Sequence, residues 1–184
     1  MSSSHDCSDA ELIRSAKTDP EAFGLLYDRY HQRIFAFVAS RLPCRALAED
    51  VTSDIWMKAL KTLPDFEPRT EWSVVAWLFA AARTTVIDAL RRHRPGESLD
   101  AEEVTELAGE DEHPSRRLDN RLAFVQLQRA IDELPPHQAH CLRLRYYGGL
   151  RNQEIAEAES LSEKTVAAHL SRALQTLRDA KIAF

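Results

Sequence analysis

The sequence is poor in glycine and proline, with 5 and 8 of them among 184 residues, and these residues are the strongest markers of turns and loops. It contains no Gly-rich phosphate loop, no GxSxG elbow and no HExxH pair. We therefore expect no enzymatic activity and no cofactor. Ala, Leu, Arg and Glu are abundant instead, and this composition predicts an all-α protein.

Cysteine is also sparse. Cys7, Cys44 and Cys141 lie far apart, without the paired spacing of a disulfide framework or a zinc site. His137, His140 and Cys141 form an HxxHC cluster, but no second cluster completes a tetrahedral ligand set. The sequence therefore predicts no metal site and a reduced, mostly buried Cys141.

Long apolar runs are absent, since none approaches the roughly 18 residues that span a bilayer. The first residues, MSSSHDCSDAE, are polar and acidic, unlike a signal peptide. We expect a cytoplasmic protein with no membrane insertion.

Acidic charge is concentrated in one segment. The chain has a formal net charge of -5, yet residues 95–115 contain many acids and neither Lys nor Arg. The same stretch has Pro, Gly and Ser but little apolar periodicity, which is typical of a flexible linker. We therefore predict two helical domains, 1–94 and 118–184, joined by an acidic linker at 95–117.

Helix signals recur on both sides of this linker. Before it we expect helices that begin at a Ser8–Glu11 capping box, at Asp19–Pro20, near Ala46 and near Trp72. The third helix has an apolar stripe formed by Val51, Ile55, Trp56, Ala59 and Leu60. After the linker we expect helices at 118–134 and 137–147.

Residues 152–178 predict a short helix, a tight turn and a longer amphipathic helix. Ser162 is placed to cap the second helix. The apolar stripe of that helix consists of Val166, Leu170, Ala173, Leu174 and Leu177. This pattern is the usual way to present a helix to the major groove of DNA, although a plain helical hairpin in a bundle has the same pattern.

A second candidate for nucleic-acid binding lies at residues 66–92. Phe66, Trp72 and Trp77 precede a helix that ends in Arg91 and Arg92. Aromatic rings stack on unpaired bases while cations follow phosphates, but core packing of the two tryptophans remains an alternative. Asp88 is spaced to pair with the arginines along the helix. Trp56 suits either the core or a contact with another protein.

Several strings together resemble one protein family. These are FGLLYDRYHQRIFAFV, AEDVTSDIWMKAL, WLFAAARTTVIDALRR and a final string from LPPHQAHCLRLRYYGGL to LSRALQTLR. In this order they resemble regions 2 and 4 of bacterial sigma-70 initiation factors of the extracytoplasmic-function (ECF) group. The resemblance implies a non-enzymatic protein that binds core RNA polymerase, directs it to promoters and helps to open DNA.

The resemblance also implies partners and contact residues. Helix AEDVTSDIWMKAL would bind the polymerase clamp through Asp50, Asp54, Trp56 and Lys58, and the flap is a further contact. The −10 element would be recognised by Phe66, Trp72, Thr84, Asp88, Arg91 and Arg92. The −35 element would be read by Ser162, Lys164, Thr165, His169 and Arg172. An anti-sigma factor is the expected regulator, and a compact, autoinhibited free protein is the other possibility.

The sequence departs from the family pattern at several positions. Glu159–Ser160 replaces the common Leu–Gly, which predicts a looser turn or a Glu159 that points to solvent. Ala167 and Ala168 stand where a basic residue is common, so −35 binding should be weaker. Arg151 replaces a capping Ser, and Asn152 could cap instead. Thr84 replaces a frequent Asn. Two other functions stay open: a stand-alone helix-turn-helix regulator and a sigma mimic that sequesters an anti-sigma factor.

Overall fold

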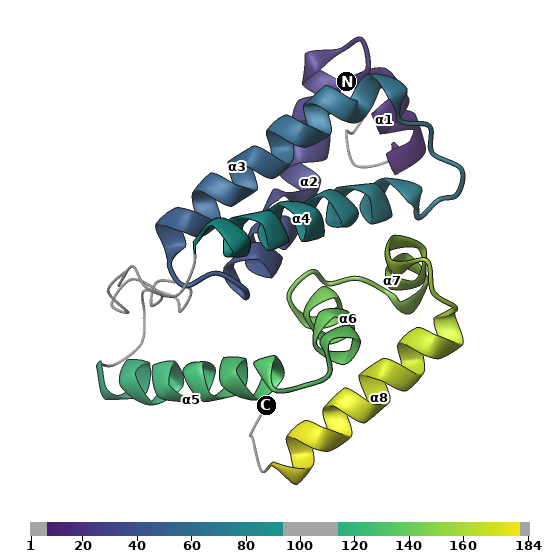
Figure 1. The fold of residues 1–184 in the computed structure, drawn as a ribbon. Coiled ribbons are helices and arrows are strands. Elements are labelled where there is room, and N and C mark those ends of the chain that lie inside the picture. Colours follow the sequence, from purple (N-terminus) through teal and green to yellow (C-terminus); the bar gives the residue numbers. More distant parts are fainter. Residues whose placement is uncertain (1–6, 94–113, 181–184) are drawn as a thin grey trace.

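The computed structural model describes residues 7–93 and 114–180, and this part of the chain contains helices and no strand. Figure 1 shows two groups of helices, α1 to α4 and α5 to α8, which lie against each other. The prediction of an all-α fold is confirmed.

The first group begins at the predicted signals. Ser8 and Glu11 form a capping box at the start of helix α1, and Asp19 accepts a hydrogen bond from the backbone of Glu21 ahead of Pro20. The elements of this group are α1 (Asp9–Ala16), α2 (Pro20–Ala39), α3 (Arg45–Thr62), the short 3-10 helix η1 (Leu63–Asp65) and α4 (Ser73–Arg92). Their bounds lie close to the predicted ones.

The second group contains the predicted helix-turn-helix. Its elements are α5 (Pro114–Asp132), α6 (Pro136–Tyr146), α7 (Asn152–Glu159) and α8 (Glu163–Asp179). Helix α5 begins at Pro114, ahead of the predicted start at 118, and proline suits the first turn of a helix. Most of the predicted linker, residues 95–113, lies outside the described residues.

The start of helix α7 differs from the prediction. Its cap position is Arg151, and Asn152 is already the first helical residue. The backbone N–H of Arg151 donates to Glu154 Oε2 at 2.6 Å, so a carboxylate inside the helix satisfies the group that Asn152 was expected to help cap.

Helix α4 is the central element of the structure, because it packs against α2, α3 and α7. Its mean hydropathy of 1.4 over an 18-residue window matches that of a membrane-spanning helix, but 56% of that window is buried inside the protein. The apolar surface is therefore that of a core helix in a globular fold.

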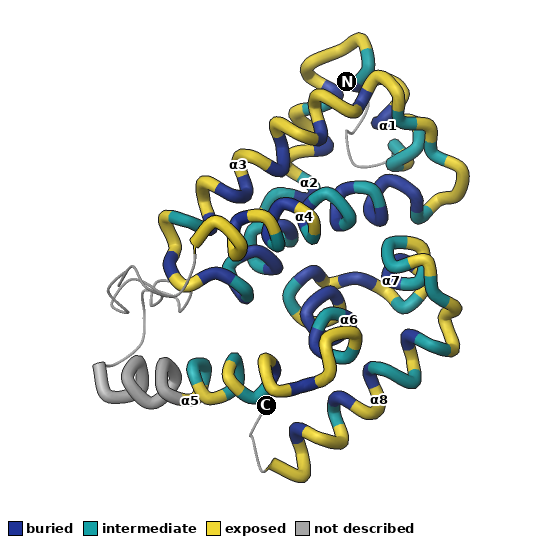
Figure 2. The backbone as a smooth tube through the Cα atoms, in the orientation of Figure 1, coloured by how far each residue is buried: buried dark blue, intermediate teal, exposed yellow. Residues whose placement is uncertain are grey.

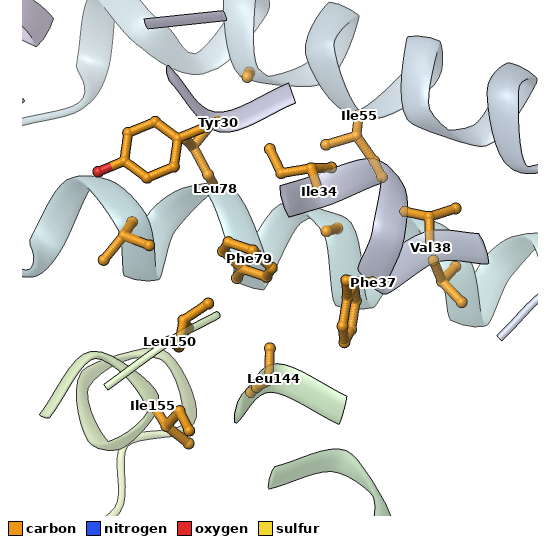
Figure 3. Close-up of a cluster of buried hydrophobic side chains, with 14 of the residues drawn as sticks. Tyr30, Ile34, Phe37, Val38, Ile55, Leu78, Phe79, Leu144, Leu150 and Ile155 are labelled. Atoms are coloured by element: carbon orange, nitrogen blue, oxygen red, sulfur yellow. The ribbon is translucent and has the colours of Figure 1, made fainter. Parts of the chain in front are cut away.

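One apolar core connects the two groups of helices. The buried faces of the helices turn toward each other (Figure 2). Phe37 and Phe79 from the first group point toward Leu144 and Leu150 from the second group, with Ile155 beside them (Figure 3). All of these side chains are at most 1% exposed.

Gly148 lies at the closest approach of this core. A Cβ added to it would be 2.7 Å from the carbonyl oxygen of Leu144 and 2.8 Å from Cε1 of Phe79, whereas one added to Gly24 in helix α2 would meet nothing within 4 Å. We expect Gly148→Ala to lower the free energy of unfolding by about 1–3 kcal/mol through overpacking.

The matched change Gly24→Ala should raise the free energy of unfolding by about 0.5–1 kcal/mol, because alanine favours the helix. Urea unfolding followed by circular dichroism measures both values. Equal effects of the two variants would show that the space at Gly148 does not matter.

Candidate nucleic-acid interface

Helix α8 presents its first turn at the surface. Ser162 Oγ accepts a hydrogen bond from the Thr165 backbone at 3.0 Å and lies 2.7 Å from Thr165 Oγ1. The predicted cap is confirmed, and it uses polar atoms of two of the candidate −35 residues. Lys164 and Arg172 are exposed, and so is Arg178 in the last turn of the helix, so helix α8 offers cations to an anionic partner along its length.

His169 lies differently from the other candidate −35 residues. Its ring stacks on that of His137 in helix α6, with centroids 6.0 Å apart. Its Nδ1 is buried and has no hydrogen-bond partner. The ring therefore packs between α8 and α6, an arrangement that spacing within α8 alone could not reveal.

The aromatic candidates of the −10 segment contact each other and the second group of helices. Phe66 and Trp77 stack with centroids 4.5 Å apart, and both are partly buried. The guanidinium carbon of Arg151 lies 4.5 Å from the ring centroid of Trp72, which is a cation–π contact. Trp77 therefore packs against the core, which is one of the two predicted alternatives. Trp72 instead contacts Arg151, the residue before helix α7.

The remaining −10 candidates are exposed on helix α4. Arg91 lies 4.0 Å from Asp88, and Arg92 Nε donates to the Asp88 carbonyl at 3.3 Å. The predicted pairing of Asp88 along the helix is confirmed, although the Arg91 contact is at the limit of an ion pair. Lys58 Nζ lies 2.8 Å from Thr84 Oγ1, so a candidate for polymerase binding contacts a candidate for −10 recognition.

The other polymerase candidates lie on two sides of helix α3. Asp50 and Asp54 line a groove of about 390 Å³ together with Arg92 and His93 of the α4 end. Trp56 is buried and its Nε1 has no partner. Its ring is packed by Phe23 and Tyr27 of helix α2.

Sequence reasoning missed an apolar surface. Leu60 was assigned to the core stripe of helix α3, but it is 45% exposed, as are Met57 at 53%, Leu25 at 40% and Tyr27 at 37%. The available signal was the position of Met57, which lies opposite the buried stripe on a helical projection. Leu25 lies about 200° from Tyr27 around helix α2 and so faces another direction, whereas Tyr27 packs on Trp56 of helix α3, next to Met57. A contiguous exposed apolar patch is typical of a surface that contacts another protein.

The turn between α7 and α8 also differs from expectation. Ser160 adopts the left-handed conformation at φ 54° and ψ 41°, so it ends the helix where Gly is usual. The Glu159 side chain is only 6% exposed. It lies 2.9 Å from His140 Nε2 and 3.2 Å from Arg83 Nη1. The prediction of a looser turn or a solvent-facing Glu159 was wrong.

Within the described ranges, no group of three His, Cys, Asp or Glu side chains could hold a metal ion. Cys141 is buried, as predicted, and is a free thiol. Burial, reinforced by the negative charge of Glu159, raises the pKa of this thiol from 9.0 to about 11. Cys141 is therefore held in its neutral form at physiological pH.

This pKa has two measurable consequences. At pH 8 we expect iodoacetamide to label the partly exposed Cys7 at least about tenfold faster than Cys141, since the thiolate is the nucleophile. Because the pKa is higher in the folded state, the contribution of Cys141 to stability should be complete below about pH 9 and lost between about pH 9 and 11. Peptide mass spectrometry gives the labelling rates, and equal rates at both cysteines would contradict the burial of Cys141.

Comparisons with known proteins agree with this geometry. Residues 26–95 match the family Sigma-70 region 2, and residues 124–177 match Sigma-70, region 4. The chain is 31% identical over 174 residues to the ECF RNA polymerase sigma factor BldN of Streptomyces coelicolor, covering 91% of this chain and 63% of that protein. It is 27% identical over 173 residues to the ECF RNA polymerase sigma factor SigK of Mycobacterium ulcerans, covering 92% and 91%.

Solved structures show the same fold. CnrH in complex with the cytosolic domain of CnrY superposes with a TM-score of 0.72 at 22% identity, over 95% of this chain and 97% of that one. RpoE of Bartonella quintana in complex with the anti-sigma factor NepR gives a TM-score of 0.63 at 19% identity, over 86% and 96%.

Proposed function

The chain belongs to the sigma-70 family, in its extracytoplasmic-function group, and from this premise we propose that it directs core RNA polymerase to specific promoters and promotes DNA opening. The observation that carries the proposal is the helix-turn-helix of α7 and α8, capped at Ser162, in one chain with the region 2 helices. A stand-alone regulator needs the first part but not the second.

We infer that helix α8 contacts the −35 element mainly through Lys164 and Arg172. Both are exposed, and Ser162 and Thr165 support the position of the helix through the cap. Each cation that neutralises a phosphate contributes to affinity and to its salt dependence. Because Ala167 and Ala168 add no further cation, we expect helix α8 to bind the −35 element weakly (a weak reader) and to depend on polymerase to hold it at the promoter.

We infer that the −10 contacts extend from helix α4 to Lys58. Thr84, Asp88, Arg91 and Arg92 are exposed on α4, and Lys58 reaches Thr84 from α3. A lysine that donates to Thr84 on the face of α4 proposed for DNA suits a phosphate backbone better than a contact with polymerase. We therefore propose that Lys58 contacts promoter DNA and not polymerase. Trp72 remains a candidate for stacking on an unpaired base.

The polymerase contact is assigned to an apolar surface of helices α2 and α3, which consists of Tyr27, Met57 and Leu60. Asp50 and Asp54 lie at the edge of helix α3 that faces α4, where charges would add specificity at the rim of an apolar contact. Trp56 lies buried under this surface, where its ring packs against that of Tyr27. An anti-sigma factor is the proposed regulator, the cytoplasm the proposed location, and no catalytic activity is assigned.

Run-off transcription tests the function. Core polymerase with this protein should produce transcripts from genomic fragments that core polymerase alone does not. We expect Lys58→Ala to lower their yield about fivefold, the effect of one contact worth about 1 kcal/mol. Lys61→Ala is the control, because Lys61 is an exposed lysine of the same helix and has no partner among the described side chains. Duplex binding without transcription would indicate a stand-alone regulator, and tight binding to an anti-sigma domain alone would indicate a mimic.

The apolar surface predicts a separate result. Leu60→Glu should weaken binding to core polymerase by at least about tenfold, because a charge replaces an apolar side chain at the centre of the contact. Leu90→Glu changes a similarly exposed leucine of helix α4 and should leave this affinity unchanged. Fluorescence anisotropy with labelled protein and no promoter DNA gives both affinities. Equal binding by the two variants would remove Leu60 from the polymerase surface.

A further inference from the structure

Helix α7 and Arg151, the residue before it, contact the start of helix α4. Ser73 Oγ donates to Glu157 Oε1 at 3.2 Å, and the Arg151 guanidinium covers the ring of Trp72. At the last residue of helix α7, Glu159 Oε2 lies 3.2 Å from Nη1 of Arg83 in helix α4. Of the residues that the proposed function offers to promoter DNA, Trp72 is covered by the chain itself, and Ser73 and Arg83 are the sequence neighbours of Trp72 and Thr84.

Further contacts hold the same arrangement from helix α2. Arg33 donates to the carbonyl oxygens of Gly148 at 2.8 Å and of Gly149 at 3.2 Å. Next to Gly149 in the sequence, Leu150 belongs to the apolar cluster that the two regions share (Figure 3). The contact between the regions therefore has an apolar centre with a polar margin, which is the organisation of a specific protein interface.

Among the described side chains, Glu159 makes the shorter of the two ion pairs between the regions, 3.2 Å against 3.9 Å for Arg33 with Glu154. The Glu159 carboxylate is buried and divides its two oxygens between His140, in its own region, and Arg83, in the other. Arg83 itself is 43% exposed, so its guanidinium can leave the pair and reach solvent. A buried carboxylate that loses one partner is costly, and opening of the regions would remove that partner.

The closed arrangement is incompatible with binding at both promoter elements. By the position numbers in their names, the −10 and −35 elements are about 25 base pairs apart, which is roughly 85 Å along B-DNA. Helix α8 starts four residues after Glu159, a stretch of at most about 14 Å. With Glu159 in contact with Arg83, the reader of one element lies beside the residues for the other. The regions must therefore separate before both elements are bound.

We propose that Glu159 is an intramolecular latch, which pairs with Arg83 to keep regions 2 and 4 closed and so lowers the affinity of the free protein for promoter DNA. The latch uses the position at which the sequence departs from the common Leu–Gly of the family. Leucine at this position could not pair with Arg83. The occlusion part of this inference rests on the proposed function, whereas the closure itself does not.

Distance measurements on the full chain test the latch. Fluorophores on Lys61→Cys in helix α3 and Gln175→Cys in helix α8, in a Cys7→Ser background, report the separation of the regions by energy transfer. Glu159→Gln preserves the shape of the side chain and removes its charge, so we expect the ratio of open to closed molecules to rise about tenfold. Arg83→Gln should have the same effect from the other side of the pair.

A charge exchange gives the sharpest comparison. Arg83→Glu and Glu159→Arg should each open the protein, and the double variant should restore closure because the pair is rebuilt with its charges reversed. Glu133→Gln is the control, since Glu133 is exposed and its side chain makes no contact with region 2 among the described residues. Circular dichroism confirms that each variant is folded. Energy transfer in Glu159→Gln and Arg83→Gln equal to that of the native protein would overturn the latch.

Transcription assays distinguish a failure of the latch from a failure of the proposed function. With core polymerase, Glu159→Gln should need less protein than the native chain to reach half-maximal transcription, because less of it is closed. Opening without this gain would overturn the regulatory part of the proposal. If the native protein gives no transcript under any condition, the proposed function fails, but the energy-transfer result still decides whether Glu159 closes the two regions.

Discussion

The close approach of helix α4 to the turn at Gly148 is the constraint on which the rest of the structure depends. Gly148 has no side chain, so the ring of Phe79 can approach its backbone and Leu150 can be fully buried beside it. Burial of this apolar surface is non-directional, and it brings helix α7 up to α4 without specifying how the two align. The charged pairs at the margin, such as Glu159 with Arg83, then set the alignment. The polar contacts are therefore a consequence of the apolar one.

Features that depend on neighbours in the sequence were predictable, and features that depend on distant partners were not. The caps at Ser8, Asp19 and Ser162 involve backbone groups within three residues, so a single sequence contains all the information that they need. Glu159 is different, because Arg83 lies 76 positions away and no local pattern links the two. His169 likewise required the position of a second helix. Candidate residues could be chosen by type, but not which of them would face each other.

Helix α4 has two requirements that oppose each other. Its apolar side must fill the core shared by both regions, and its polar side is the proposed contact for single-stranded DNA. Thr84, Asp88, Arg91 and Arg92 stay exposed on this polar side, and helix α7 contacts α4 at Ser73 and Arg83. For region 4 to move away from these residues, the contacts with α7 must be reversible. Hydrogen bonds and ion pairs at the rim, where water competes for each group, suit a reversible contact. The solvent-exposed side of Arg83 is an example.

Weak binding of helix α8 to DNA and the Glu159 latch act together. Ala167 and Ala168 leave Lys164, Arg172 and Arg178 as the exposed cations of helix α8, and so few phosphate contacts give a shallow salt dependence and little affinity. Such a helix cannot by itself supply the free energy that separates two regions with a common apolar core. Polymerase can, because it holds the protein beside the promoter and makes the second contact effectively intramolecular. A reader that is weak on its own thus keeps the closed state dominant until polymerase is present, and a stronger reader would open the protein on DNA alone.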